Sequence, residues 1–178
     1  MSGNLLILAA GGHGGVVKET AIAMGKFPKI DFLDDRSDLA IGKCKDYKKF
    51  VNSYTYAFVA IGSNEIRMKW LEELMEAGFQ IPILVDPTAY VSPSVSIAIG
   101  SIICAKAVLN TKVVIEMGCI VSIGAMVDHD SIVGEYSHIN TGAIIKANSK
   151  IERLKKINAG MIYADEKQKK VTSYEIEV

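Results

Sequence analysis

The feature of this sequence that most constrains its fold is an aliphatic residue at every sixth position of the second half. From Val85 onward, thirteen consecutive positions spaced six residues apart are Val, Ile or Leu. These positions are Val85, Val91, Ile97, Ile103, Leu109, Ile115, Val121, Val127, Val133, Ile139, Ile145, Ile151 and Ile157. An α-helix or an ordinary two-faced strand does not repeat every six residues. The period therefore predicts stacked coils that bury one another's apolar side chains.

A second series lies four residues after each aliphatic position and consists of small or β-branched residues. Its members are Ala89, Val95, Ser101, Ala107, Val113, Cys119, Ala125, Ser131, Ser137, Ala143 and Ser149. We interpret the two series as a left-handed parallel β-helix, with one short strand per hexapeptide and three strands per coil. The aliphatic residue points into a triangular prism, and the small residue fits a corner. The regular pattern ends near Ser149, because Lys155 takes the next small position, so we expect about four coils.

The first 80 residues alternate strand-like and helix-like segments. Three apolar runs have the length of buried parallel strands, namely residues 5–9, 30–34 and 56–61. Two segments carry apolar positions at helical spacing, residues 16–24 and 65–77. This order predicts a small Rossmann-like α/β domain. We expect an α/β domain over 1–83, a β-helix over 84–162 and a C-terminal tail over 163–178.

Composition excludes several classes of protein. The 20 basic and 20 acidic residues give a formal net charge of zero, so binding of nucleic acid through bulk charge is not expected. No apolar run approaches the roughly 20 residues that span a bilayer, so we expect no membrane insertion. The three cysteines are widely spaced and odd in number, which favours a reducing, cytoplasmic location. The N-terminal apolar run follows no basic stretch and reads as a strand, not a signal peptide.

Three short segments at the ends of the predicted strands are candidate ligand contacts. They are Gly11, Gly12, His13 and Gly14 after the first strand, Asp34 and Asp35 at the second, and Ser63, Asn64 and Arg67 after the third. Glycines let a backbone approach an anion, and the following helix offers free N–H groups. Each segment also has a plainer interpretation: a tight strand-to-helix turn, a solvated acidic turn, and a helix N-cap at Asn64. NAD binding competes for the glycine turn, but the spacing lacks a full G-x-G-x-x-G.

The candidate catalytic residues lie on the β-helix. His129 comes two residues after the inward Val127, so it points outward, toward solvent or a subunit interface. Imidazole, with an ordinary pKa of about 6.5, suits a general base at neutral pH. Asp130, with Asp128 as the second candidate, would fix the tautomer and stabilise the imidazolium. The alternative is an exposed turn in which the histidine has no chemical role.

This combination of a Gly-Gly-His-Gly turn, an acidic pair and a His-acid pair on a hexapeptide β-helix resembles the bacterial sugar acetyltransferases. These are the sialic-acid O-acetyltransferases and the nucleotide-linked 4-amino-sugar N-acetyltransferases. The resemblance implies a homotrimer with acetyl-CoA in a cleft between neighbouring β-helices, acting in surface glycan synthesis. It implies that the three N-terminal segments hold a nucleotide sugar or sialic acid. It also implies that His129 is the general base, that His138 lies beside the thioester, and that Gly142 lets the cofactor approach.

One departure from the family pattern leaves alternatives open. Family members carry more β-helix after the catalytic coil, so we expect a shortened cleft here. A non-catalytic nucleotide-sugar-binding or scaffold relative is therefore the alternative function, and a structural interface histidine is the alternative for His138. No metal is expected, because the β-helix has only two histidines and catalytic zinc takes three protein ligands.

Overall fold

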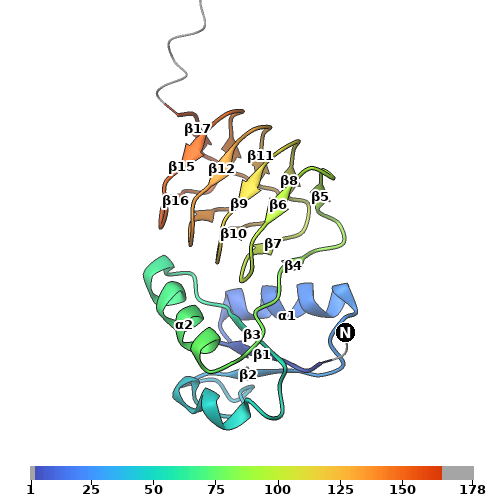
Figure 1. Cartoon of the computed structure of the whole chain (residues 1–178), viewed down its shortest axis with the longest axis vertical. Coiled ribbons are helices and arrows are strands. Elements are labelled where there is room, and N and C mark those ends of the chain that lie inside the picture. The colour runs from blue at the N-terminus through green and yellow to red at the C-terminus, as the bar shows by residue number, and fades with distance from the viewer. Residues whose placement is uncertain (1–2, 166–178) are drawn as a thin grey trace, which may run out of the picture.

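The computed structural model describes residues 3–165, which form a small α/β region followed by a parallel β-helix (Figure 1). The α/β region has a three-stranded parallel sheet in the order β2-β1-β3. Its elements are β1 (Leu5–Leu8), α1 (Gly12–Met24), β2 (Ile30–Leu33), the 3-10 helix η1 (Cys44–Phe50), β3 (Tyr56–Val59) and α2 (Asn64–Glu76). All four residues of β1 are buried, as expected for the central strand of a sheet covered on both faces.

The β-helix consists of two-residue strands, β4 to β17, arranged as three parallel sheets. The β4 sheet contains β4 (Leu84–Val85), β7 (Ile102–Ile103), β10 (Ile120–Val121), β13 (His138–Ile139) and β16 (Lys156–Ile157). The β5 sheet contains β5 (Tyr90–Val91), β8 (Val108–Leu109), β11 (Met126–Val127), β14 (Ile144–Ile145) and β17 (Ile162–Tyr163). The β6 sheet contains β6 (Ser96–Ile97), β9 (Val114–Ile115), β12 (Ile132–Val133) and β15 (Lys150–Ile151). The predicted fold class, an α/β region followed by a β-helix of about four coils, is confirmed.

The second residue of each strand points into the prism, and the small residues fill the space between coils. Val121 pairs with Ile103 on one side and Ile139 on the other, a step of one coil in each direction. The inward aliphatic residues and the small residues Ala107, Cys119, Ala125 and Ala143 form one buried cluster. Each coil therefore completes the core of its neighbours.

The coils continue past Ser149, although the regular pattern of small residues ends there. Lys155 occupies a small-residue position, yet its carbonyl accepts the N–H of His138 and its own N–H donates to Ser137 Oγ. Its side chain is exposed, and no further coil encloses it in the part of the chain that the structure describes. Tyr163 closes the last strand and packs on the core. The rest of the predicted tail, 166–178, lies outside the described residues.

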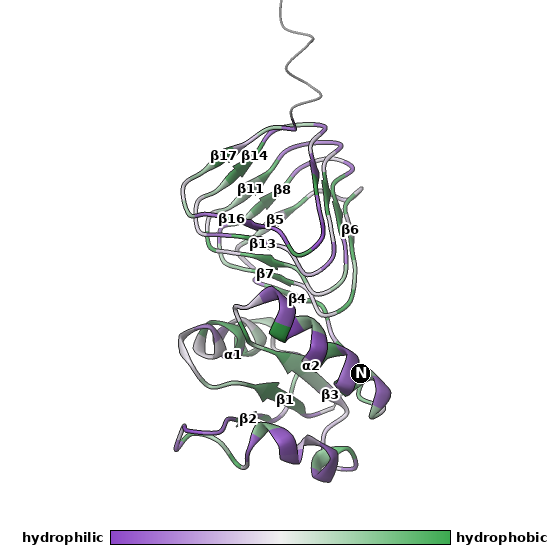
Figure 2. Cartoon of the chain, turned by 90° about the vertical axis from the view of Figure 1, so that its left-hand side faces the viewer, coloured by the Kyte–Doolittle hydropathy of each residue, from purple (hydrophilic) through white to green (hydrophobic). Residues whose placement is uncertain are grey.

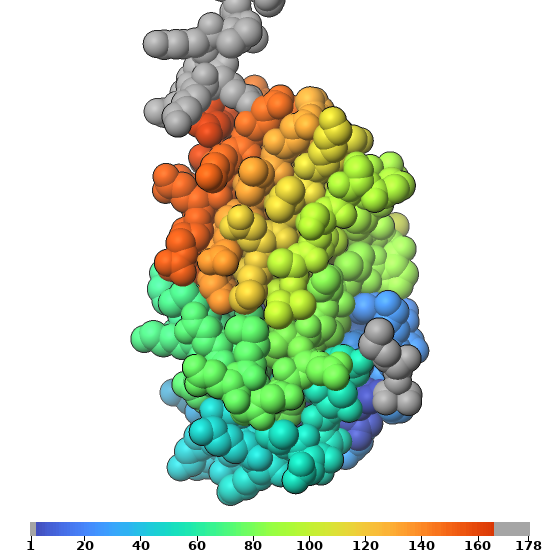
Figure 3. Space-filling view, viewed as in Figure 1, coloured from blue at the N-terminus to red at the C-terminus, as the bar shows by residue number. Residues whose placement is uncertain are grey.

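The α/β region covers one side of the prism and leaves another bare. Leu84, Ile102 and Ile120 face outward from the β4 sheet but are buried against α1 and β1, and the two regions pack in direct contact (Figure 3). Within residues 3–165, no element covers the outward residues of the β5 sheet in this way. They are Tyr90, Val108, Met126, Ile144 and Ile162, here called the β5 stripe. Tyr90 is 58% and Ile162 61% exposed, and Figure 2 shows the apolar character of these strands.

Within residues 3–165, neither helix has the length and apolar character needed to cross a membrane.

Candidate active site

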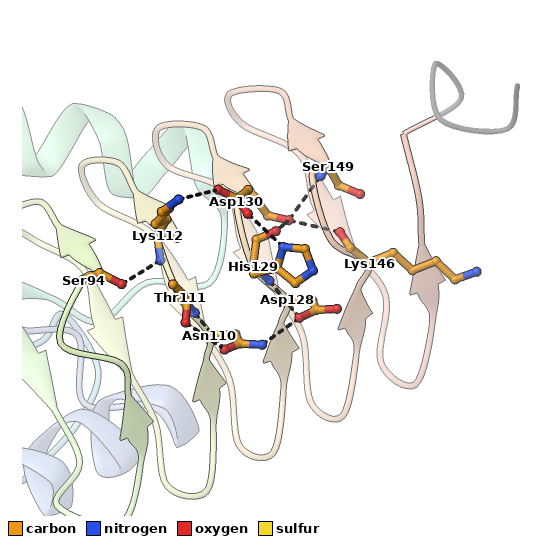
Figure 4. Close-up of polar contacts among 10 residues, drawn as sticks. Ser94, Asn110, Thr111, Lys112, Asp128, His129, Asp130, Lys146 and Ser149 are labelled. Carbon is orange, nitrogen blue, oxygen red and sulfur yellow. Dashed lines mark hydrogen bonds and ion pairs between the residues drawn. The ribbon is translucent and has the colours of Figure 1, made fainter. Parts of the chain in front are cut away.

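His129 and Asp130 form a hydrogen-bonded pair at the corner between the β5 and β6 sheets (Figure 4). Nδ1 of His129 lies 2.8 Å from Oδ2 of Asp130, and the side chains are 47% and 42% exposed. Because an ionised carboxylate only accepts hydrogen bonds, Nδ1 carries the proton and Nε2 keeps a free lone pair. The pair is therefore arranged so that Nε2 of His129 can accept a proton.

The neighbouring coil braces this corner. Oδ1 of Asp128 accepts the backbone N–H of His129 at 2.8 Å and a hydrogen bond from Asn110 Nδ2 at 2.8 Å. Lys112 Nζ lies 3.9 Å from the other oxygen of Asp130. Asp130 has a left-handed backbone (φ 56°), which aspartate tolerates better than most residues. Asp130 is thus the carboxylate that contacts the imidazole, whereas Asp128 fixes the backbone.

A cavity of about 220 Å³ lies between the start of α1 and the outer face of the β4 sheet. It brings together residues far apart in the sequence: His13, Val16, Gly62, Cys104, Ser122, Ile123, His138, Asn140 and Thr141. His13 and His138, assigned from sequence to different ligands, thus line one cavity. Within one protomer, His129 is not among its lining residues.

Burial keeps both histidines of this cavity neutral at pH 7. Desolvation, with a further contribution from the charge of Arg67, lowers the pKa of His13 to about 4. Desolvation also lowers the pKa of His138 to about 4, with smaller contributions from the charges of Arg67, Lys156 and His13. Nε2 of His13 and Nδ1 of His138 are buried and have no hydrogen-bond partner within the described part of the chain. Such groups are expected to find a partner when a ligand enters.

The glycine turn is shaped by close packing and by Asp34. The N-cap of α1 is Gly11, and a Cβ at Gly14 would lie 2.3 Å from the carbonyl oxygen of Ala9. Oδ2 of Asp34 accepts the backbone N–H of Ala10 at 2.8 Å. That bond, with others from backbone amides, lowers the pKa of Asp34. Asp34 therefore braces the turn, with its carboxylate engaged by backbone groups.

Asp35 and the residues at the start of α2 also make structural contacts. Oδ1 of Asp35 accepts the N–H of Cys44 at 3.1 Å. Ser63 is the N-cap of α2, the position that we considered for Asn64. Asn64 lies inside the helix, and its amide donates to the carbonyl of Leu154 at 2.9 Å.

Arg67 joins the two regions and has no free donor for a substrate phosphate, which corrects its assignment from sequence. Its side chain is 1% exposed. It donates to the carbonyls of Gly118 at 2.7 Å and Tyr136 at 2.6 Å, and to Asn64 Oδ1 at 2.8 Å. Longer bonds reach the carbonyls of Ile61, Gly62 and Ser137. The guanidinium holds α2 against the coils and places its charge near the cavity.

Gly142 has a left-handed backbone (φ 64°), and the space beside its Cα is open. It follows Thr141 of the cavity lining, at the corner between the β4 and β5 sheets.

Sequence reasoning missed Ser122, whose Oγ lies 2.9 Å from Nε2 of His138. The spacing of residues on neighbouring coils could have identified it. Ile120 pairs with His138 one coil away, so Ser122, two residues later, also faces outward beside the histidine.

No group of three or more His, Cys, Asp or Glu side chains in residues 3–165 is placed to hold a metal ion.

Comparison with known proteins gives matches to both regions. Residues 4–74 match the family model of the PglD N-terminal domain. The acetyltransferase domain of PglB from Neisseria gonorrhoeae FA1090 is 31% identical, with a TM-score of 0.70 over 91% of this chain and 92% of that one. The same domain in complex with acetyl coenzyme A is 30% identical, with a TM-score of 0.71 over 91% of this chain and 93% of that one.

A third similar structure is PerB from Caulobacter crescentus in complex with CoA and GDP-perosamine. It is 24% identical, with a TM-score of 0.71 over 92% of this chain and 91% of that one, a likeness that shows the fold. The alignments cover 92%, 93% and 91% of these three solved chains, in the order given. The expected shortening of the cleft stays a prediction.

Proposed function

The chain belongs to the hexapeptide-repeat sugar acetyltransferase family, and we propose that it transfers an acetyl group from acetyl-CoA to a nucleotide-linked amino sugar or sialic acid in surface glycan synthesis. One observation carries the proposal. On a β-helix that is similar to an acetyltransferase domain, Nδ1 of His129 is hydrogen-bonded to the Asp130 carboxylate, which leaves Nε2 to accept a proton. The non-catalytic alternative rests on an expected shortening of the β-helix, and the coverage of more than nine-tenths of the solved acetyltransferase domains favours the enzyme instead.

The reaction is direct acyl transfer, with His129 as general base. The acceptor nitrogen or oxygen attacks the thioester carbonyl carbon and forms the new C–N or C–O bond. Nε2 of His129 takes the proton that the acceptor loses, and Asp130 stabilises the imidazolium. The C–S bond then breaks, its electron pair leaves on sulfur, and the imidazolium returns the proton to the thiolate. In this proposal His138 lies on the thioester side of the reacting groups.

The β5 stripe supports a homotrimer in which each site spans two copies. Two sides of the prism differ: the β4 sheet is covered, whereas three of the five apolar residues of the β5 stripe are exposed, Tyr90, Met126 and Ile162. Exposed apolar patches of this kind mark interaction surfaces. If three β5 sheets face a common axis, the His129 corner of one copy lies beside the Thr141–Gly142 corner of the next. Nε2 of His129 in one copy would then lie beside the cavity of the next copy, which is lined by that copy's His13 and His138.

The acceptor is proposed to bind the α/β region, residues 1–83, and acetyl transfer to take place on the β-helix, residues 84–162. The match of residues 4–74 to the PglD N-terminal domain supports this division of roles. Gly11, Gly12 and His13 are the proposed contacts, because α1 begins there and helix N-termini attract phosphate. Three buried free cysteines are consistent with the cytoplasm, where we place the reaction.

The test measures acetyl transfer from acetyl-CoA to a nucleotide-linked 4-amino sugar. The reaction is monitored through the CoA thiol that it releases. His129→Ala should lower kcat/KM at least about 100-fold, the usual contribution of a positioned base. Thr111→Ala changes an exposed residue one coil below and is the matched control. Activity of His129→Ala within about tenfold of wild type would contradict the general-base role. Calorimetry with acetyl-CoA and with UDP separates an enzyme from a protein that binds only the nucleotide.

A further inference from the structure

The cavity beside α1 contains a Ser-His contact with an uneven hydrogen-bond pattern. Nε2 of His138 lies 2.9 Å from Ser122 Oγ. Nδ1 of the same ring is buried and has no partner among residues 3–165. The two residues sit on adjacent coils of the β4 sheet, so the backbone ladder fixes their relation.

Hydrogen-bond accounting distinguishes the two neutral tautomers of His138. If Nδ1 carries the proton, the Ser122 hydroxyl donates to Nε2 and only one group, the Nδ1–H, awaits a partner. If Nε2 carries the proton, it donates to Ser122 Oγ. The serine hydroxyl then needs another acceptor, and the lone pair of Nδ1 is buried without a donor. Nδ1 lacks a partner in either tautomer, and the first is favoured because it provides the hydroxyl of half-buried Ser122 with an acceptor, Nε2 of His138.

The charges around His138 act in one direction. Arg67, held within the interface, and Lys156, on the next coil, both disfavour the imidazolium, as does His13 across the cavity. Burial acts the same way, and the pKa of about 4 leaves the ring neutral at pH 7. A neutral imidazole carries a single N–H, so its tautomer decides whether it presents a donor or an acceptor to the cavity.

We propose that Ser122 is a positioning residue that holds the proton of His138 on Nδ1, so that a neutral N–H donor points at the acetyl carbonyl oxygen. This inference rests on the proposed function, because it takes the thioester as the occupant of the cavity. Negative charge develops on that oxygen during attack, and a preorganised donor stabilises it. No proton moves at His138 in this step, and the general base remains His129.

Nitrogen NMR of histidine-labelled protein tests the tautomer without any substrate. The chain has three histidines, so single substitutions assign every signal. In the wild type at pH 7 the long-range ¹H–¹⁵N spectrum should show Nδ1 of His138 protonated and Nε2 not. Ser122→Ala should add the Nε2–H tautomer, whereas Ser122→Thr, which keeps a hydroxyl, should retain the wild-type pattern. Ser94→Ala, a serine outside the cavity, is the control and should leave His138 unchanged.

Kinetics provide the functional arm of the test. Ser122→Ala should lower kcat about tenfold or more while KM for acetyl-CoA changes little, since an oxyanion donor can contribute 100-fold or more. Ser122→Thr should restore most of the loss. A wild-type Nε2–H tautomer, or unchanged kcat in Ser122→Ala, would overturn the proposal. If the wild type transfers no acetyl group, the proposed function fails, and the spectrum still decides the tautomer.

Discussion

Removing the Arg67 guanidinium should destabilise the protein through the contact between its two regions. The four bonds to Gly118, Tyr136, Ile61 and Asn64 are 3.0 Å or shorter. At about 1.5 kcal/mol each, the low end for hydrogen bonds to a charged group, they contribute about 6 kcal/mol. Burial lowers the pKa of Arg67 from 12.5 to about 10, so desolvating the charge costs about 3 kcal/mol. Arg67→Ala should therefore lower the free energy of unfolding by about 3 kcal/mol.

The assay is urea unfolding followed by the fluorescence of Trp70, the single tryptophan. Trp70 is well placed because it lies on α2, with its ring edge-on to Tyr47 at 5.8 Å. Arg153→Ala is the matched control, since that arginine is 58% exposed and makes only long contacts, to Glu135 at 3.9 Å and to Met68 Sδ of α2 at 3.4 Å. It should change the free energy by less than about 1 kcal/mol. An equally small effect of Arg67→Ala would refute the interpretation of Arg67 as the link between α2 and the coils.

Three further predictions concern the turn, the histidines and the catalytic pair. Gly14→Ala should lower the free energy of unfolding by about 2 kcal/mol, because its Cβ would lie 2.3 Å from a carbonyl oxygen. Gly15→Ala is the control and should be neutral or stabilising, because a Cβ there has nothing within 4 Å. Equal effects of the two substitutions in thermal melts would contradict this reasoning. The folded pKa values of His13 and His138, about 4, lie below the unfolded value of 6.5, so stability present above pH 6.5 should be lost as the pH falls toward 4. The loss should be up to about 3 kcal/mol for His13 and less for the more exposed His138, and urea titrations of their glutamine variants should show a weaker pH dependence. Asp130→Asn should lower kcat at least about tenfold with KM for acetyl-CoA nearly unchanged, and a normal kcat would remove the carboxylate from the mechanism.

The β-helix could be predicted from sequence because its information is local and periodic. The position of Val121 depends on its pairing with Ile103 and Ile139, which lie one coil away on either side. The six-residue period predicts both pairings. The same arithmetic placed His129 on the outer surface. It failed at Lys155 because, among the described residues, no further coil packs there to exclude a long side chain.

Features that depend on how α1 and α2 pack against the coils were not predictable in the same way. The shared cavity of His13 and His138 exists only because α1 covers the β4 sheet, and no local period encodes that contact. Arg67 looked like an anion contact, since a charged residue after a strand is usually exposed. Its burial depends on backbone carbonyls that the coils present more than 50 positions later, at Gly118 and Tyr136.

Subunit complementation tests most directly whether each site combines His129 of one copy with the cavity of the next. His129→Ala and His138→Ala, each impaired alone, would be co-expressed with different tags, and mixed assemblies isolated. In a trimer that contains both variants, one seam of the three joins an intact His129 to an intact His138, so about a third of wild-type activity should return. Mixed assemblies no more active than their parents would show that the two histidines do not meet across a seam.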